Sequence, residues 1–332
     1  MDIRCRSRVG RTVATASGAI LAAGALLIAF AYADTQPRRQ MQTTEHRVRV
    51  NSAEYPWSAI GRVNKAIGGH CTGALVGRRL VITAAHCIWN PNTRQFLAPQ
   101  SIHFVAGYRV ADYIQHAKAA RIFIPKEYLP ESAPTGANAI YDWALVVLEQ
   151  DVGDVTGYLG IAYVDAARLK TLKRAHAVFV QAGYSRDQRQ VLTAHFACPL
   201  GEFVEGGALI AHKCEAVPGD SGSPILMAED GRIRVVAIHV ATTQETAQPI
   251  GAAVPVASFA DGIRELGAGE ASPPPAGTLV PRDSVRMLLT RLGYEPEPNL
   301  SAAIESFQKA RGLKQTGEVS HALLAQLIQA LK

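Results

Sequence analysis

The sequence predicts a mainly β protein that carries a small helical unit at its C-terminal end. Residues from about 57 to 264 form many short runs rich in Val, Ile and Ala, separated by Gly, Pro and Asn turns, as in ALVGRRLVIT and RIRVVAIHVAT. A proline-rich spacer follows, and beyond it the apolar residues recur with the period of an α-helix. Regularly spaced short strands over about 200 residues are typical of a β-sandwich or a pair of β-barrels.

The N-terminal segment, residues 1–33, has the layout of a cleaved secretory signal. A basic front ending at Arg11 precedes an Ala-rich apolar run, which closes on the small-residue triplet AYA at 31–33. The alternative is an uncleaved membrane anchor, because the run from Val13 to Ala33 approaches the length that spans a bilayer. Cleavage predicts a secreted or periplasmic protein, and the membrane is a partner only if the segment is retained.

The composition is that of a globular protein with a mild positive charge. Hydrophobic residues make up 48% and charged residues 19% of the chain, and the formal net charge is +6. Part of that charge leaves with the arginines of the predicted signal, and no clustered basic stripe remains. The sequence therefore predicts no nucleic-acid partner.

Changes in composition divide the rest of the chain. Residues 34–49 are polar and lack a period, so we expect a linker or a propeptide. Residues 50–264 form the predicted β domain, and residues 265–281, rich in Pro, Gly and Ala, form a spacer. In residues 282–332 the spacing predicts three helices, with glycines at 293 and 312 ending the first two and Ser320 as the N-cap of the third.

The cysteines suggest disulfides. Removal of the signal takes Cys5 and leaves an even number, which in an exported chain favours disulfide bonds, with three pairings open. The remaining cysteines are Cys71, Cys87, Cys198 and Cys214. Their spacings contain no CxxC motif, so the sequence predicts neither a metal site nor a cofactor.

The stretch PGDSGSP, residues 218–224, contains a candidate nucleophile, Ser221. A serine hydroxyl reacts at neutral pH only when a base removes its proton and a third group orients that base. VITAAHC places His86 after an apolar strand, and DWALVVLE places Asp142 just before another. Taken singly, each residue fits a structural role, but the order His, Asp, Ser along the chain is characteristic of one group of serine hydrolases.

These motifs resemble those of the trypsin-like serine peptidase family. CTGALVGRRLVITAAHC, DWAL and PGDSGSP together carry the resemblance, which covers roughly residues 50 to 262. It implies the chymotrypsin-like fold, two six-stranded antiparallel β-barrels. It also implies a serine endopeptidase that cleaves protein or peptide substrates through an acyl-enzyme.

The resemblance assigns a role to each catalytic residue. Ser221 is expected to attack the scissile carbonyl, His86 to transfer the proton, and Asp142 to orient the imidazole. Backbone N–H groups of Gly219 and Ser221 are expected to form the oxyanion hole, and one such donor contributes about 3 kcal/mol to transition-state stabilisation.

The resemblance also bears on the cysteines. It implies a Cys71–Cys87 disulfide that clips the loop beside the catalytic histidine. That pairing leaves Cys198 and Cys214 as the second disulfide, which would tie the segment before the nucleophile to an upstream strand. It implies no cofactor and no metal.

The region before the predicted β domain departs from the family pattern. Family members free a short Ile-Val-Gly-Gly type terminus whose amine is buried against the acid before the nucleophile, which here is Asp220, and this chain has only RVRVNSAEYPW in that region. Cleavage after Arg47 or Arg49 would expose Val48 or Val50, and the alternative is a chain that is active without cleavage.

The specificity pocket receives two conflicting signals. Glu215 lies at the position of the pocket base, where an acid favours Lys or Arg in the substrate. His239, in AIHVATT, resembles a histidine of bacterial glutamyl-specific relatives that holds an acidic side chain, although Ala241 and Thr242 replace the expected glycine pair. The sequence leaves the pocket open.

The C-terminal unit resembles the peptidoglycan-binding domain type 1 family. The matching features are the LGY turn, AIESFQKARGL from Ala303 to Leu313, and the turn at Thr316 and Gly317, with Phe307 and Gln308 the strongest match. The resemblance implies that peptidoglycan is a partner and that this unit holds the enzyme on the bacterial cell wall. The alternative is a helical accessory unit that has lost ligand binding.

Two functions of different classes follow. The leading one is an exported serine endopeptidase targeted to the cell wall by its C-terminal domain. The alternative is a cell-envelope binding protein with a catalytically inert peptidase scaffold, which the missing family terminus favours.

Overall fold

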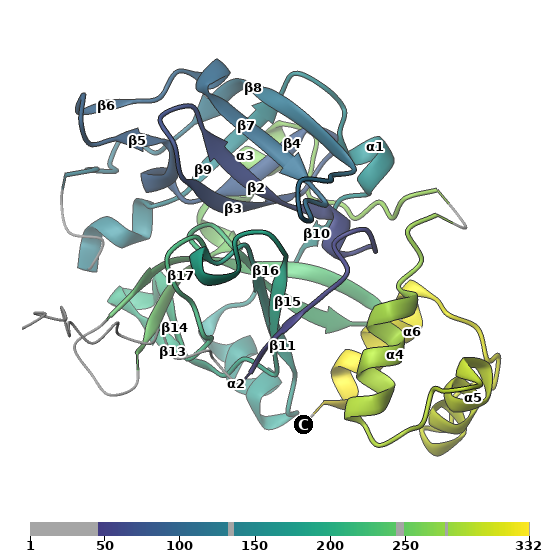
Figure 1. The fold of residues 1–332 in the computed structure, drawn as a ribbon. Coiled ribbons are helices and arrows are strands. Elements are labelled where there is room, and N and C mark those ends of the chain that lie inside the picture. Colours follow the sequence, from purple (N-terminus) through teal and green to yellow (C-terminus); the bar gives the residue numbers. More distant parts are fainter. Residues whose placement is uncertain (1–45, 132–135, 244–248, 276–277, 332) are drawn as a thin grey trace, which may run out of the picture. The chain divides into compact units, whose positions relative to one another are not determined.

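The computed structural model describes residues 46–131, 136–243, 249–275 and 278–331. The predicted signal, residues 1–33, and most of the predicted linker or propeptide lie outside these ranges. None of the helices within them combines the length and the apolar character that a membrane crossing needs. Contacts along the chain join Gln42–Lys332 into one compact unit, whose elements are drawn in Figure 1.

The first group of strands closes into a six-stranded antiparallel barrel, as predicted. Its β-branched runs are buried along their whole length in β4 and β9, which is the pattern expected of strands inside a packed barrel. In the order of their pairing, the strands are β2 (Ile60–Lys65), β3 (His70–Leu75), β4 (Leu80–Thr83), β9 (Ala144–Leu148), β8 (Gln115–Phe123) and β7 (Ile102–Ala106). A short hairpin, β5 (Trp89–Asn90) with β6 (Gln95–Phe96), stands apart from the barrel.

The second group forms a nine-stranded sheet whose strand path is open, so the predicted pair of closed six-stranded barrels is only partly realised. Along the path the strands are β1 (Arg47–Arg49), β12 (Thr193–Phe196), β11 (Phe179–Gly183), β15 (Pro224–Glu229), β16 (Arg232–Thr242), β17 (Gly251–Pro255), β14 (Leu209–His212) and β13 (Leu200–Val204). The ninth, β10 (Gly160–Ile161), pairs in parallel with β16. Strand β1 lies at the end of the predicted linker. The sequence did not predict this strand, because three residues are too few to show a period.

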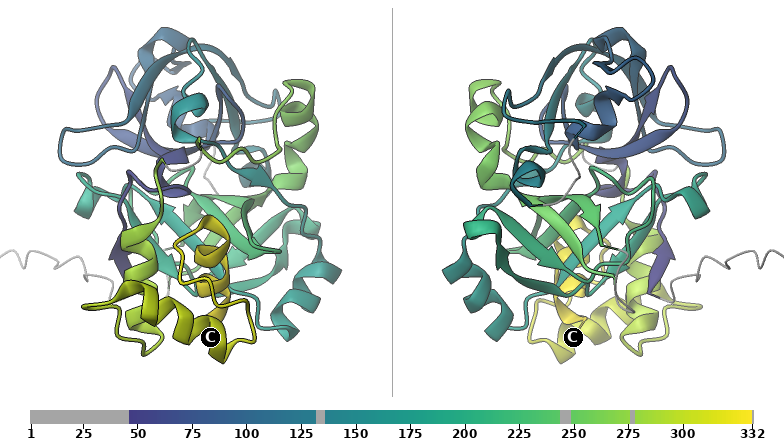
Figure 2. Two further views of the ribbon diagram at one scale, coloured as in Figure 1. Left: turned by 90° about the vertical axis from the view of Figure 1, so that its right-hand side faces the viewer. Right: turned by 90° about the vertical axis from the view of Figure 1, so that its left-hand side faces the viewer.

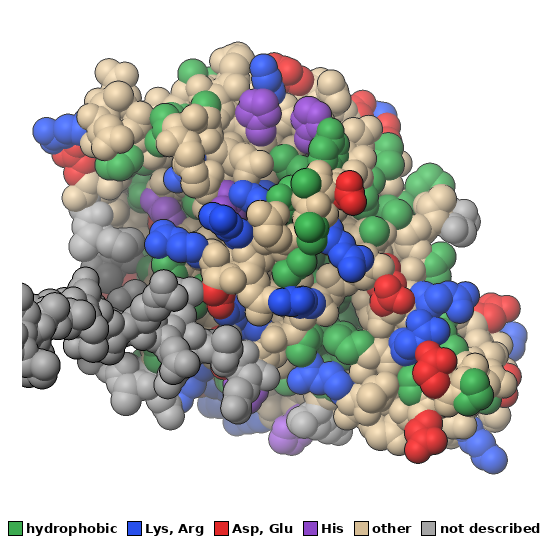
Figure 3. Space-filling model, in the orientation of Figure 1, with side chains coloured by type: hydrophobic (Ala, Val, Ile, Leu, Met, Phe, Trp, Pro, Cys, Tyr) green, Lys and Arg blue, Asp and Glu red, His purple; other side chains and the backbone are tan. Residues whose placement is uncertain are grey.

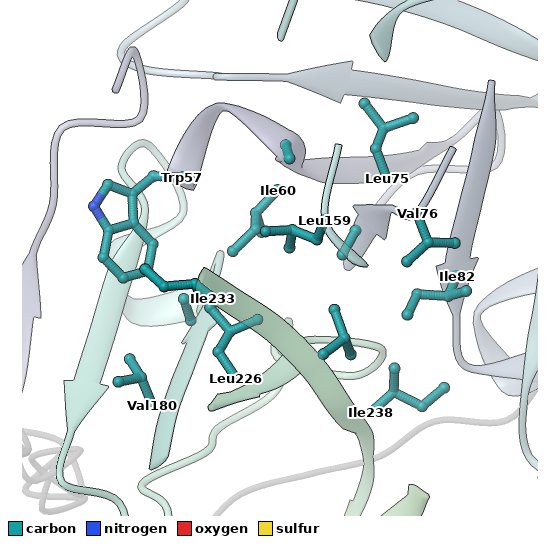
Figure 4. Packing of buried hydrophobic residues seen from close by; sticks show 14 of the residues in the cluster. Trp57, Ile60, Leu75, Val76, Ile82, Leu159, Val180, Leu226, Ile233 and Ile238 are labelled. Atoms are coloured by element: carbon teal, nitrogen blue, oxygen red, sulfur yellow. The ribbon is translucent and has the colours of Figure 1, made fainter. Parts of the chain in front are cut away.

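One hydrophobic cluster joins the barrel to the second sheet. Figure 4 shows Ile60, Leu75 and Ile82 of the barrel facing Leu226 and Ile238 of the second sheet. Each such side chain stabilises the fold by roughly 1.5–3 kcal/mol when it is fully buried. The two groups of strands are therefore held against each other by a continuous apolar core.

Short helices connect the strands, and three longer ones end the chain. The short ones are α1 (Gly153–Thr156), α2 (Ala166–Arg174) and α3 (Ala260–Glu265), and the C-terminal ones are α4 (Arg282–Arg291), α5 (Leu300–Ala310) and α6 (His321–Ala330). The side chain of Ser320 accepts a hydrogen bond from Leu323 N at 3.0 Å, which is the predicted N-cap. Gly293 and Gly312, with φ of 84° and 67°, follow the first two helices as expected of C-terminal caps.

The C-terminal helices pack against the second sheet. Helix α6 contacts β15 and β16, and Gln329 Nε2 donates to the carbonyl of Ala228 at 2.9 Å. At the start of α4, Glu54 accepts from Ser284 N at 3.0 Å, and Trp57 Nε1 donates to Ser284 Oγ at 2.9 Å. Both views in Figure 2 show these yellow-green helices beside the second sheet.

The surface carries charges of both signs. On the face drawn in Figure 3, Lys and Arg side chains alternate with acidic, hydrophobic and other polar side chains. Several of the basic side chains pair with acids, among them Arg168 with Glu229 at 2.8 Å and Lys173 with Glu202 at 2.6 Å.

Candidate active site

His86 and Asp142 meet in the closed barrel. His86 lies in a 3₁₀ turn, Ala85–Ile88, that follows β4, and Asp142 lies just before β9, the partner of β4 in the sheet. Asp142 Oδ2 is 2.7 Å from His86 Nδ1, and its Oδ1 accepts from the backbone N–H of His86 at 2.9 Å. The carboxylate therefore fixes both the ring and the main chain of the histidine.

The two side chains of this contact differ in their exposure to solvent. The Asp142 side chain is 1% exposed, whereas the His86 side chain is 32% exposed, so the ring forms the open end of the pair. With Nδ1 held as a donor to the carboxylate, Nε2 is the nitrogen that can accept a proton. An imidazole oriented in this way has the properties of a general base.

Ser221 lies in the loop between β14 and β15, and that loop passes against the segment that carries the histidine. The carbonyl of Ser221 accepts from Thr72 N at 2.9 Å and lies 3.9 Å from Sγ of Cys87, the residue after His86. A Cβ at Gly222 would come within 2.8 Å of Ala84 N, so glycine permits this close approach. The structure thus brings the backbone of Ser221 next to Cys87, the residue that follows His86.

The backbone conformation and the surroundings of Gly219 require glycine. Its φ is 103°, and a Cβ there would lie 2.5 Å from the carbonyl oxygen of Tyr184, so no other residue fits. Thr72 Oγ1 donates to the Gly219 carbonyl at 2.9 Å and so helps to fix the orientation of the loop. Within the described residues, the amides of Gly219 and Ser221 donate to no protein acceptor, which leaves both able to bind a developing negative charge.

Asp220, between these two residues, is buried with its side chain 3% exposed. Its carboxylate accepts from Ser185 Oγ at 2.8 Å and from Val217 N at 2.9 Å. Burial raises the pKa of Asp220 to about 6, while the Val217 hydrogen bond and the charge of Arg47 act in the opposite direction. The acid is therefore held inward, beneath the loop.

The two candidate specificity residues make different contacts. Backbone N–H of Glu215 donates to His195 Nδ1 at 3.0 Å, and the Glu215 carboxylate lies 3.9 Å from His46 Nε2, at the end of the sheet where β1 and β12 pair. His239 instead pairs along β16 with the nucleophile loop, because its carbonyl accepts from Gly222 N at 2.7 Å. Of the two, His239 is the one adjacent to the candidate nucleophile.

A buried chain of histidines leads away from this position. His212 Nε2 is 3.0 Å from His239 Nδ1, and His239 Nε2 is 3.3 Å from the hydroxyl oxygen of Thr242. At the inner end, Cys214 N donates to His212 Nδ1 at 3.2 Å. Gly251 lies opposite His212 in the β14–β17 pair, and it leaves room for the imidazole ring.

These hydrogen bonds determine which ring nitrogens carry protons. Because His212 Nδ1 accepts from an amide, the proton of the neutral ring is assigned to Nε2, which lies 3.0 Å from His239 Nδ1, and the ring also hydrogen-bonds the backbone of Ala252. The Nδ1 of His239 then accepts, so its Nε2 carries the proton toward Thr242. Burial, followed by the charges of His212 and His86, lowers the pKa of His239 well below its ordinary value, and burial lowers that of His212 to about 3. The chain therefore presents a neutral N–H donor.

Both disulfides predicted from the resemblance are present. One joins Cys71 of β3 to Cys87, the residue after His86, and the other joins Cys198 to Cys214. The second also anchors the segment whose amide orients His212. Sequence reasoning missed the role of His212, and its only local signal is its place two residues before a cysteine.

Comparison with known proteins identifies the class to which this fold and site belong. Residues 45–263 match the trypsin family, so the chain belongs to that family of serine endopeptidases, as the three motifs predicted. Among curated proteins it is similar to a glutamyl endopeptidase of Bacillus licheniformis, with 25% identity over 191 residues. That match covers 57% of this chain and 55% of the relative.

A solved structure of a Glu endopeptidase in complex with MPD is also similar. Its TM-score is 0.53 at 21% identity, and the match covers 67% of this chain and 96% of that one. At this identity the likeness concerns the fold, which is the chymotrypsin-like arrangement of strands.

Proposed function

We propose that this protein is a serine endopeptidase that cleaves after acidic residues by an acyl-enzyme mechanism. The observation that carries the catalytic part is the buried Asp142 carboxylate, which binds both the ring and the backbone N–H of His86. Ser221 loses its proton to His86 Nε2 as its Oγ attacks the scissile carbonyl carbon. The oxygen of that carbonyl becomes negatively charged and is bound by the amides of Gly219 and Ser221.

The rest of the cycle returns each group to its starting state. His86 gives its proton to the leaving amine as the peptide C–N bond breaks, which leaves the acyl group as an ester of Ser221. Water then attacks the ester, losing its proton to the imidazole, and the serine is regenerated with release of the new carboxyl terminus. Asp142 remains ionised throughout and stabilises the imidazolium.

The preference for an acidic residue rests on the histidine chain. Because His239 is held as a neutral Nε2–H donor beside the nucleophile loop, it can hydrogen-bond a carboxylate of the substrate without a charged partner. The hydroxyl of Thr242, 3.3 Å from that nitrogen, is a second group at the same point. The name of the Bacillus relative, glutamyl endopeptidase, agrees with this assignment. The Glu215 carboxylate instead lies 3.9 Å from His46 Nε2.

A fluorophosphonate probe tests the catalytic proposal. The folded protein is expected to be labelled, Ser221→Ala is expected to lose the label, and Ser272→Ala, on the proline-rich spacer, serves as a matched serine control. If processed, folded protein takes up no label, the endopeptidase is excluded and the alternative of an envelope-binding protein with an inert scaffold is favoured.

A peptide library tests the acidic preference. Substrates identical except for Glu, Asp, Gln or Lys before the scissile bond are compared by kcat/KM at one pH. We expect Glu or Asp to exceed Gln by at least about 10-fold, because a buried donor left without a charged acceptor costs about 1–3 kcal/mol. Preference for Lys would instead assign the pocket to Glu215.

We further propose that the C-terminal helices bind peptidoglycan and hold the enzyme on the bacterial cell wall. The support is the sequence match around Phe307 and Gln308, together with the contacts that Gln308 makes in the fold. Gln308 is 6% exposed, and its Oε1 accepts from Thr316 N at 2.8 Å and Gly317 N at 3.1 Å. These residues therefore maintain the fold of the unit, and ligand contacts would come from its exposed side chains.

Sedimentation tests this second proposal. The full chain carrying Ser221→Ala, which avoids digestion, is mixed with purified, insoluble peptidoglycan and with chitin as a matched insoluble polymer. We expect the protein to sediment with peptidoglycan and to remain in solution with chitin. Equal recovery in both supernatants would favour a helical accessory unit that has lost ligand binding.

Export to the cell envelope is the last part of the proposal. It rests on the basic and apolar layout of residues 1–33 and on the two disulfides, which form in oxidising compartments. N-terminal sequencing of protein recovered from the periplasm or the medium is expected to show cleavage after the AYA triplet. Protein that stays with the membrane and retains residue 1 would support the anchor instead.

A further inference from the structure

Arg47 brings a positive charge near Asp220, the acid that the family pattern pairs with a new N-terminal amine. It lies on β1, pairs with His195 of β12, and its side chain is only 3% exposed. Its guanidinium donates to Ser185 Oγ and makes a two-point contact with the Asp187 carboxylate. Arg47 Nη1 also lies 3.9 Å from Oδ2 of Asp220.

Ser185 links this cation to the acid beneath the oxyanion loop. Its Oγ donates to Asp220 at 2.8 Å and accepts from the guanidinium, so the three groups form a continuous buried network. Two carboxylates, Asp187 and Asp220, face the single Arg47 charge, and their side chains are 13% and 3% exposed. A buried carboxylate needs a nearby cation or several donors, because its loss of hydration is otherwise uncompensated.

The position of Asp220 decides the position of the two oxyanion donors. It is flanked in sequence by Gly219 and Ser221, whose amides form the proposed hole. Gly183 provides the space for its carboxylate, since a Cβ there would collide with Oδ1. If the carboxylate left this site, the peptide on either side would have to rotate, and the amides would no longer point at a common acceptor.

We propose that Arg47 is a positioning residue for the oxyanion hole, supplying to Asp220 the positive charge that a freed N-terminus supplies elsewhere in the family. This inference rests on the proposed serine endopeptidase function. It also concerns activation: cleavage after Arg47 or Arg49 would leave Arg47 on the released piece and remove the cation from the network. The active chain therefore begins at or before Arg47 and needs no cut at either site.

The accessibility of the two arginines agrees with this inference. The Arg47 side chain is buried within the network, whereas Arg49 is exposed and its Nε donates to Gln188 Oε1 at 3.0 Å. The two residues lie on one strand and carry the same charge, but only Arg47 contacts the network beneath the loop. Arg49 is thus a matched control.

The test compares Arg47→Met, Arg47→Lys and Arg49→Gln in the full chain. We expect Arg47→Met to lower kcat by as much as about 10²- to 10³-fold, the effect of losing an oxyanion donor, with KM little changed. Arg47→Lys should retain more activity than Arg47→Met, and Arg49→Gln should match the parent. For Arg47→Ala, added methylguanidinium should restore labelling by a fluorophosphonate, which a loss of stability alone would not produce.

Two results would overturn the inference without touching the proposed function. The first is that folded Arg47→Met takes up the fluorophosphonate label at the same rate as the parent protein. The second does not depend on the folding of any variant: the labelled parent is sequenced from its N-terminus, and a terminus at Val48 or Val50 would contradict the proposal. A parent that takes up no label would instead refute the serine endopeptidase itself.

Discussion

Substituting Gly251 by alanine tests the histidine chain with the addition of one carbon atom. A Cβ at this position would lie 2.7 Å from His212 Nδ1 and closer still to Cε1 and Nε2. The nearest ring atom, Cε1, would be 2.1 Å from this Cβ, so the ring must recede by about 1.4 Å to reach ordinary contact at about 3.5 Å. Moved that far, the 3.0 Å hydrogen bond between His212 Nε2 and His239 Nδ1 lengthens to about 4 Å and is lost.

The loss has a calculable consequence for substrate choice. A buried polar group left unpaired costs about 1–3 kcal/mol, and His239 also loses the partner that holds its proton on Nε2. We expect kcat/KM for a Glu substrate to fall about 10- to 100-fold, with a smaller fall for the matched Gln substrate. Labelling of Ser221 by a fluorophosphonate should change little, because the Asp142 contact with His86 is untouched.

A double-mutant cycle supplies the control. On a His212→Ala background the added methyl group of Gly251→Ala meets no ring, so the second substitution should have almost no further effect on the Glu to Gln ratio. If Gly251→Ala leaves that ratio unchanged in the parent, or lowers it equally on both backgrounds, the assignment of acidic preference to this histidine chain is refuted.

Three further predictions concern stability. The folded-state pKa of His212 is about 3, below the ordinary value of 6.5, so the folded state binds fewer protons than the unfolded state between these values. The contribution of His212 to the free energy of unfolding is therefore fully present above pH 6.5 and falls by up to about 1.4 kcal/mol per pH unit below it. In thermal melts, the melting temperature of His212→Gln should fall less steeply with decreasing pH than that of the parent. Glu54→Ala removes the acceptor of Ser284 N at the start of α4, so denaturant titrations should show an unfolding free energy lower by about 1–2 kcal/mol. An unchanged midpoint would show that this hydrogen bond does not stabilise the protein. Gln308→Leu leaves the amides of Thr316 and Gly317 without their acceptor, so melting should occur at lower temperature while peptidase activity at 25 °C is retained; a parallel loss of activity would contradict a purely structural role.

The catalytic motifs could be predicted because their evidence is local. The apolar strands, the turn residues and the short motifs around His86, Asp142 and Ser221 each consist of residues close together in the chain, and the order of the three motifs can be read directly from it. The closed barrel and the class of protein followed from them. The open path of the second sheet did not, because the pairing of its edge strands depends on three-residue segments such as β1 that carry no period.

The sequence by itself determined the strand-rich fold, the helical end of the chain, the family and the candidate nucleophile with its base. Only the tertiary structure shows the contacts that Glu215 and His239 make and the groups that surround Asp220. His212 reaches His239 through the register of β14, β17 and β16, and Arg47 reaches Asp220 through the pairing of β1 with β12. Such contacts join residues far apart in the chain, so no spacing along it records them, and they exist only once the sheet has fixed which strands are neighbours.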